Sequence, residues 1–109
     1  MEEQEVVVAL AALAQSSRLR VFRTLIVAGP LGLTPGAISD ELGVAATTLS
    51  FHLKELTQAG LITQQRDGRH LIYRAAYDRM NEVLQYLTEH CCQGDSCLAT
   101  AQFAGSSTC

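Results

Sequence analysis

The sequence contains no tryptophan, only two prolines and no long apolar run. The scarcity of proline argues against a low-complexity chain, and no run approaches the ~20 apolar residues of a membrane helix. The N-terminus is acidic (Glu2, Glu3 and Glu5), whereas a secretory signal begins with positive charge. We therefore expect a cytoplasmic protein with one main domain and no membrane partner.

The net charge is only −3, and it is unevenly distributed along the chain. Residues 1–15 and 76–109 carry −3 each, whereas residues 16–43 carry +1 and residues 44–75 carry +2. The middle of the chain is therefore basic between two acidic ends. A DNA-binding surface needs only local positive charge, so the negative total does not exclude one.

The basic middle contains an amphipathic helix signal. Leu49, Leu53 and Leu56 recur at helical spacing and form one narrow apolar stripe. Phe51 and Lys54 fall roughly opposite that stripe. A helix that presents phenylalanine and lysine together on its outer face is suited to dock against another molecule.

A hairpin signal follows this helix. Two short apolar runs, 61–63 and 71–73, enclose Asp67-Gly68, a dipeptide typical of a two-residue β-turn. Arg66 and Arg69 flank the turn. A helix followed by a hairpin with a basic tip predicts a winged helix-turn-helix, a mainly α fold with one β-hairpin (α+β). Its recognition helix enters the DNA major groove and its wing reaches the phosphates.

Two more helices are expected before the recognition helix. The first, over 18–28, would be capped by Ser16-Ser17 and stopped by Gly29-Pro30. The second, over 35–42, begins at Thr34-Pro35 and ends at Gly43. The side chains expected in the core are Leu19, Phe22 and Ile26 from the first of these helices and Ala37, Ile38 and Leu42 from the second.

The two outer helices carry more apolar surface than one small chain can cover. Residues 5–14 are apolar almost all round, which is typical of a helix buried on more than one side. Residues 77–90 form a final helix whose apolar stripe continues at Cys91; the stripe consists of Met80, Val83, Leu84 and Leu87. We therefore expect a homodimer that pairs through the N- and C-terminal helices.

All four cysteines lie in the last fifth of the chain: Cys91, Cys92, Cys97 and Cys109. Structural disulfides belong to secreted proteins, so such a cluster in a cytosolic chain favours metal or redox chemistry. Residues 1–92 are expected to form the DNA-binding and dimerisation domain, and residues 93–109 a flexible cysteine-containing tail.

Several motifs occur together in this chain: Leu19-Arg20-Val21-Phe22, Glu41-Leu42-Gly43-Val44, Thr48-Leu49-Ser50-Phe51-His52-Leu53-Lys54-Glu55-Leu56, Ala59-Gly60-Leu61-Ile62 and Arg66-Asp67-Gly68-Arg69. Over roughly residues 6–90 they resemble the ArsR/SmtB family. The resemblance implies a dimeric winged-helix repressor that metal or metalloid ions release from double-stranded operator DNA.

The resemblance also narrows the choice of effector ion. One branch of the family has a Cys-x-Cys pair just after Glu-Leu, where this chain has Gly43-Val44-Ala45. A zinc-sensing branch has Asp-x-His, where this chain has Asp78 followed by Arg79 and Met80. The C-terminal cysteines are instead similar to a third, arsenic-responsive group. The implied effector is arsenic(III) or antimony(III), held by Cys91, Cys92 and Cys97, with Cys109 dispensable and no organic cofactor.

The cysteines alone leave other interpretations open. The same scaffold could sense oxidation or sulfide through its thiols, or another soft metal or a methylated arsenical. A structural zinc site and inert thiols are further alternatives. A thiol enzyme is not expected, because only His90 lies near the cysteines and no Cys-x-x-Cys motif is present.

The expected DNA contacts come from the recognition helix and the wing. Thr47, Thr48, Ser50 and Phe51 are predicted to reach base edges, and Lys54, Arg66 and Arg69 to contact phosphates. His52, at the edge of the leucine stripe, is expected to be a hydrogen-bonded structural histidine. A two-fold dimer then predicts an inverted repeat with half-sites about one DNA turn apart.

Overall fold

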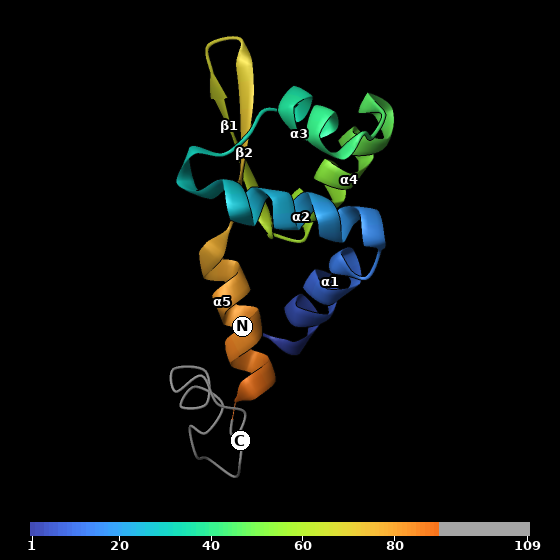
Figure 1. The fold of residues 1–109 in the computed structure, drawn as a ribbon. Helices are drawn as coiled ribbons and strands as arrows, with labels where there is room; N and C mark the ends of the chain where they lie inside the picture. Colours follow the sequence, from blue (N-terminus) through green and yellow to red (C-terminus); the bar gives the residue numbers. More distant parts are fainter. Residues whose placement is uncertain (90–109) are drawn as a thin grey trace, which may run out of the picture.

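The computed structural model describes residues 1–89, which form five α-helices, one 3-10 turn and one antiparallel hairpin. The elements are α1 (Glu3–Leu13), α2 (Ser16–Ala28), η1 (Gly29–Leu31), α3 (Pro35–Leu42), α4 (Ala46–Gln58), β1 (Ile62–Asp67), β2 (His70–Ala75) and α5 (Tyr77–Thr88). Helix α2 crosses the middle of the molecule, with α3, α4 and the hairpin on one side and α1 and α5 on the other (Figure 1). The predicted mainly α fold with a β-hairpin is confirmed.

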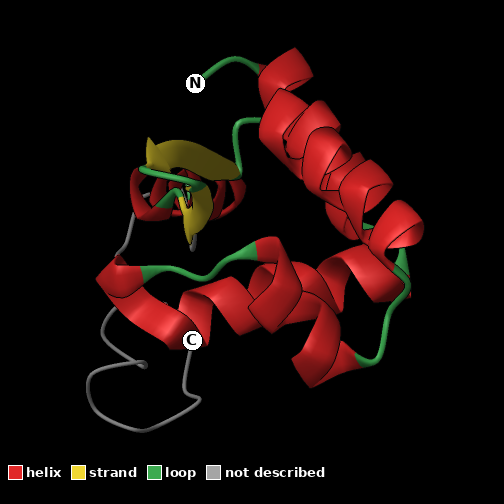
Figure 2. Ribbon diagram, turned by 90° about the horizontal axis from the view of Figure 1, so that it is seen from above, coloured by secondary structure: helices red, strands yellow, loops and turns green. Residues whose placement is uncertain are grey.

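The core lies where α1, α2 and α4 meet the start of the hairpin. Leu25, Leu49 and Leu56 are fully buried there, together with Leu61 just before β1. Full burial of one such side chain contributes about 1.5–3 kcal/mol, so this junction fixes how α4 is oriented. Seen from above, the hairpin is nearly end-on and set to one side of the helical body (Figure 2).

The predicted inward face of α2 is partly wrong. Phe22 is buried as expected, but Val21 and Leu25 take the positions predicted for Leu19 and Ile26. Leu19 is exposed, and Ile26 is only half-buried. The helix has two overlapping apolar stripes, and the one formed by Val21 and Leu25 is the one that packs into the core.

The helix ends are only partly as predicted. Thr34 caps α3 by accepting a hydrogen bond from the backbone N–H of Ala37 (3.2 Å), and Gly43 ends it in the left-handed conformation. In α3 only Ile38 is fully buried, whereas Ala37 is exposed and Leu42 half-buried. The cap of α2 is not Ser16-Ser17.

Helix α2 begins at Ser16, two residues earlier than predicted. Both serines therefore lie inside its first turn. The side chain of Gln15 instead accepts a hydrogen bond from the backbone N–H of Arg18 (2.8 Å). A longer amide side chain thus satisfies one of the unpaired donors at the start of the helix.

The hairpin is longer than predicted, and its turn lies one residue further on. Asp67 pairs with His70, so the two turn residues are Gly68 and Arg69 rather than Asp67-Gly68. Gly68 has a φ of +64°, the conformation that a tight hairpin turn requires. Arg69 therefore sits in the turn itself.

The last helix is shorter than predicted, because α5 ends at Thr88 and Glu89 has a non-helical ψ of 129°. Within the described residues, the apolar stripe of α5 therefore ends at Leu87. Residues 90–109, which include all four cysteines, lie outside the described residues, so the boundary at residue 92 and the tail 93–109 stay predictions. Between residues 1 and 89, no helix is long and apolar enough to cross a membrane.

Candidate nucleic-acid interface

The turn between α3 and α4 fixes how the second helix leaves the first. The hydroxyl of Ser39 donates to the carbonyl oxygen of Val44. The carbonyl of Ser39 in turn accepts hydrogen bonds from the backbone N–H groups of Gly43 (2.8 Å) and Val44 (3.3 Å). A short, internally bonded turn of this kind holds two helices at a fixed angle, as a helix-turn-helix requires.

Helix α4 buries its leucine stripe and exposes the face opposite. Leu49, Leu53 and Leu56 are buried. All the helix residues predicted to contact DNA are exposed: Thr47, Thr48, Ser50, Phe51 and Lys54. Phe51 is 54 % exposed, although burial of its apolar ring would be favourable. An aromatic ring held in water beside hydroxyl groups is suited to contact a thymine methyl.

The predicted wing residues are exposed as well. The side chains of Arg66 on β1 and Arg69 in the turn form no hydrogen bond or ion pair with any other described residue. The same is true of Lys54 on α4. Three cations without protein partners are therefore available for phosphates, but their contact with DNA stays a prediction.

A groove lies between α4 and the wing, with a volume of about 320 Å³. Ser50, Lys54 and Gln58 line it from α4, and Gln64 lines it from β1. Sequence reasoning missed Gln64. Its position two residues before Arg66 was a usable signal, because side chains alternate along a strand and both therefore lie on the same face.

His52 is buried, but the predicted hydrogen bonding is not seen at its Nδ1 atom. Within residues 1–89 this nitrogen has no hydrogen-bond partner, and the side chain is only 5 % exposed. Burial, and secondarily the positive charge of Arg18, lower the pKa of His52 below its ordinary value. At neutral pH, the buried side of α4 therefore carries an uncharged imidazole.

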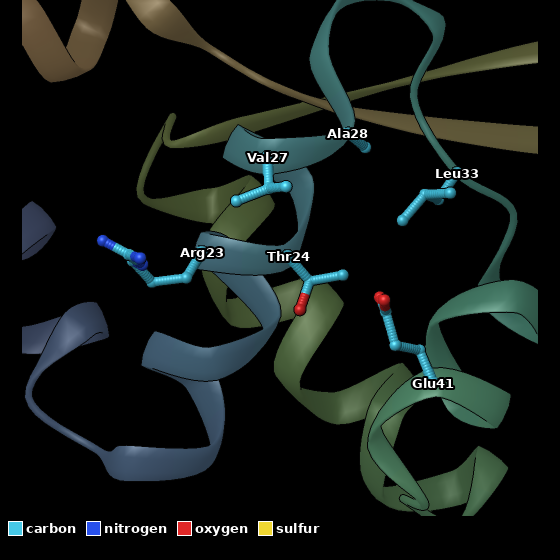
Figure 3. A pocket seen from close by; sticks show the side chains of 6 residues that line it. All are labelled: Arg23, Thr24, Val27, Ala28, Leu33 and Glu41. Atoms are coloured by element: carbon cyan, nitrogen blue, oxygen red, sulfur yellow. The ribbon is translucent and has the colours of Figure 1, made fainter.

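A second cavity, of about 340 Å³, lies between α2 and α3 (Figure 3). Thr24 and Glu41 reach toward each other from these two helices, whereas Arg23 points away. Among residues 1–89, Val27, Ala28 and Leu33 complete the lining of this cavity. Across the part of the chain that the structure describes, no cluster of three or more His, Cys, Asp or Glu side chains could hold a metal ion.

The predicted metal ligands Cys91, Cys92 and Cys97 lie outside the described residues, as does Cys109. The structure therefore exposes the predicted DNA contacts of α4 and of the wing but leaves the predicted effector site untested. What it adds is the place from which the cysteine segment departs, which is the end of α5.

Comparison of the sequence with known proteins finds similar transcriptional regulators. A family model described as a helix-turn-helix domain matches residues 13–65. The "Uncharacterized HTH-type transcriptional regulator YceK" of Bacillus subtilis is 40 % identical over 58 residues, which are 53 % of this chain and 57 % of that protein. The "Putative arsenical resistance operon repressor ArsR" of Halobacterium salinarum is 38 % identical over 60 residues, 55 % of this chain and 46 % of that protein. The match thus spans about half the length of these two relatives.

Solved structures share the fold over more of the chain. An "ArsR-like Transcriptional Regulator" from Rhodococcus sp. RHA1 has a TM-score of 0.74 at 24 % identity and covers 96 % of each chain. A "homodimeric winged helix-turn-helix DNA-binding domain" from Mycobacterium bovis has a TM-score of 0.64 at 27 % identity, over 85 % of this chain and 86 % of that one. The described residues therefore have the winged helix-turn-helix fold.

Proposed function

We propose that this chain is a DNA-binding transcriptional repressor of the ArsR/SmtB type. The observation that carries the proposal is the exposed face of α4, which presents Thr47, Ser50 and Phe51, together with the exposed cation Arg69 at the wing tip. It combines hydrogen-bonding groups and an aromatic ring for base edges with unpaired cations for phosphates. The family resemblance and the regulators named above support the same function.

The repressor acts as a homodimer. Helices α1 and α5 leave large apolar side chains exposed: Val7, Val8, Leu10, Leu84 and Leu87. Leu84 and Leu87 are 52 % and 55 % exposed. A second copy related by a two-fold axis would cover these faces and present two α4 helices to an inverted repeat.

DNA binding is tested directly with the full chain and the DNA upstream of its own coding sequence. Titration by fluorescence anisotropy should give binding to that DNA at least ~10³-fold tighter than to random DNA of equal length. Hydroxyl-radical footprinting should then show two protected half-sites about one helical turn apart. Equal affinity for both DNAs would contradict the proposed function.

The effector is arsenic(III) or antimony(III), bound by Cys91, Cys92 and Cys97. These ions are soft and take three thiolates, which matches the cysteines in number and kind. The chain places the three cysteines within nine residues of the end of α5, one of the two helices proposed for dimerisation. The Halobacterium relative, which bears the name of an arsenical resistance repressor, supports this effector.

One titration separates this effector from its alternatives. The reduced protein, bound to its operator, is titrated in parallel with arsenite, antimonite, zinc and cadmium. Release by arsenite and antimonite at stoichiometric concentration is the expected result. Release by cadmium or zinc alone would identify another soft metal as the effector. Release that only an oxidant or sulfide causes, and that a reducing agent reverses, would indicate a thiol-based sensor on the same scaffold.

A further inference from the structure

The end of α2 has a carbonyl group that its own helix cannot satisfy. In an α-helix the carbonyl of Ile26 would accept a hydrogen bond from the N–H of the residue four positions on. That residue is Pro30, which has no N–H. The hydroxyl of Tyr77, the first residue of α5, donates to this carbonyl instead, at 3.1 Å. The start of α5 therefore closes the end of α2.

A second side chain from the same junction binds a carbonyl four residues further along the chain. Nε of Arg74, near the end of β2, donates to the carbonyl oxygen of Pro30 at 2.7 Å. Another nitrogen of the same guanidinium donates to Oε1 of Gln65 on β1 at 2.9 Å. The planar guanidinium thus links both strands of the wing to the turn that follows α2.

The backbone of the same loop lies directly against the wing. Leu33 and Tyr73 exchange both of their backbone hydrogen bonds, at 2.9 and 2.8 Å. Gly32 has a φ of +70°, and a β-carbon there would lie 2.5 Å from the carbonyl oxygen of Tyr73. Only glycine allows this approach. The base of the wing thus contacts the loop at Pro30, Gly32 and Leu33.

We infer that Arg74 and Tyr77 are positioning residues that set the wing angle and the direction of α5 against the end of α2. Figure 1 shows the three parts meeting where β2 runs into α5. Both side-chain hydrogen bonds are exposed, so each contributes little to overall stability and acts on geometry. Residues 74–77 connect the end of β2 to the start of α5. A shift of α5 is therefore passed to the wing through this segment. The inference rests on the proposed function in so far as the wing contacts DNA.

The first test separates the hydrogen-bonding geometry of the Arg74 guanidinium from its positive charge. In R74K the positive charge remains, but a single ammonium cannot donate to Pro30 and Gln65 with the same geometry. Operator affinity should fall about 5–10-fold, the effect of losing about one hydrogen bond to DNA, because a displaced wing no longer aligns Arg69 with phosphate. The matched control, R20K, changes an exposed arginine of α2 that is not among the predicted DNA contacts and should stay within about two-fold. Wild-type affinity in R74K would overturn the role of Arg74.

A double variant tests whether Arg74 acts through the wing. A displaced wing has already lost part of its Arg69 contact, so the losses from R74K and R69A should be less than additive when combined. Additive losses would mean that Arg74 contacts DNA independently, which would overturn the inference.

The second test needs no DNA. Y77F removes only the hydroxyl that reaches Ile26, and Y86F removes the hydroxyl of another tyrosine on α5 as the matched control. Residual dipolar couplings of backbone N–H groups measure how α5 and the wing are oriented relative to α2. We expect a changed orientation of α5 in Y77F and of the wing in R74K, with Y86F as wild type. Unchanged couplings in both variants would overturn the inference whether or not the protein binds DNA. If the couplings change in the two variants but the wild-type protein does not bind DNA, only the proposed function is contradicted.

Discussion

The guanidinium of Arg79 covers Gly60, because its Nε lies 2.9 Å from the position that a β-carbon on residue 60 would take. Gly60 follows the last turn of α4 with a φ of +78°, and its N–H bonds back to the carbonyl of Thr57 at 3.0 Å. Arg79 also pairs with Glu5 of α1 at 3.4 Å. One side chain of α5 thus contacts both α1 and the end of the proposed recognition helix.

Replacing Gly60 with alanine should destabilise the protein by about 1–2 kcal/mol, the cost of a left-handed backbone for a residue with a β-carbon. The flexible tip of Arg79 can move aside, so the backbone conformation carries most of this cost. Urea denaturation measures it. The matched control is Gly36→Ala in α3, where φ is ordinary and a β-carbon meets open space. Gly36→Ala should be neutral or stabilising, by up to ~1 kcal/mol. A similar loss in both variants would contradict this account.

Stability should fall below about pH 6.5 because of His52. Its pKa is lowered in the folded state, mainly by burial, so the unfolded chain binds the proton first as the pH falls. The stabilisation is therefore complete above the unfolded pKa and is lost as the pH drops toward the folded one. Urea unfolding at fixed protein concentration between pH 5 and 8 measures the slope.

His52→Gln is the control for this slope, since glutamine does not titrate. Its stability should be nearly independent of pH in the same window. Glu5, whose pKa is lowered mainly by a hydrogen bond from the backbone N–H of Glu2, loses its contribution only at more acidic pH, below its ordinary value of 4.5. A variant with the same slope as wild type near pH 6 would show that another group is responsible.

Arg69→Ala should weaken binding to operator and random DNA by the same factor. Its side chain, in the wing turn, is proposed to contact phosphate, and loss of one phosphate contact lowers the salt slope by about 1. Binding isotherms at several salt concentrations measure both effects. Phe51→Ala is the comparison, because loss of a base contact should change which operator is preferred. A changed preference in Arg69→Ala would mean that its role has been assigned wrongly.

Leu84→Asp should convert the dimer to a monomer, since it places a charge in the proposed apolar interface. Sedimentation at micromolar concentration measures the change. Leu31→Asp is the matched control, because Leu31 is 86 % exposed and belongs to η1 rather than to the helices proposed for dimerisation; it should leave the dimer intact. A wild-type protein that sediments as a monomer would contradict the proposed assembly.

Serine substitutions identify the effector ligands. Cys91→Ser, Cys92→Ser and Cys97→Ser should each abolish arsenite-driven release from DNA without weakening DNA binding, because a pyramidal site loses one of three thiolates. Cys109→Ser is the matched control and should release normally. Normal release by Cys97→Ser would contradict the three-thiolate site and favour a methylated arsenical on the vicinal pair.

The outward face of α4 could be predicted because its stripe of Leu49, Leu53 and Leu56 permits only one orientation. The orientation of α2 could not. Leu19, Val21 and Leu25 are all apolar, and the choice among them is made by packing against other helices. The outer part of β1 also gave no signal, since residues 64–67 are polar and exposed and are ordered only by pairing with β2.

The junction of α2, the wing and α5 was likewise beyond the reach of local sequence patterns. Tyr77 and Ile26 are 51 positions apart, and Arg74 and Pro30 are 44 apart. Helical or strand periodicity relates only near neighbours. The one clue was Pro30, which guarantees an unsatisfied carbonyl at Ile26 but does not say which side chain will reach it.

That proline has a consequence for building chimeric regulators, in which the wing of one protein is transplanted into another to change its operator preference. A cassette limited to residues 62–75 would carry Arg74 into a body that offers no matching carbonyl, and it would leave Tyr77 behind. The smallest interchangeable unit is discontinuous: residues 26–33 must travel together with residues 62–77. Transplants cut at the strand ends alone are expected to fold and yet hold the new wing at the wrong angle.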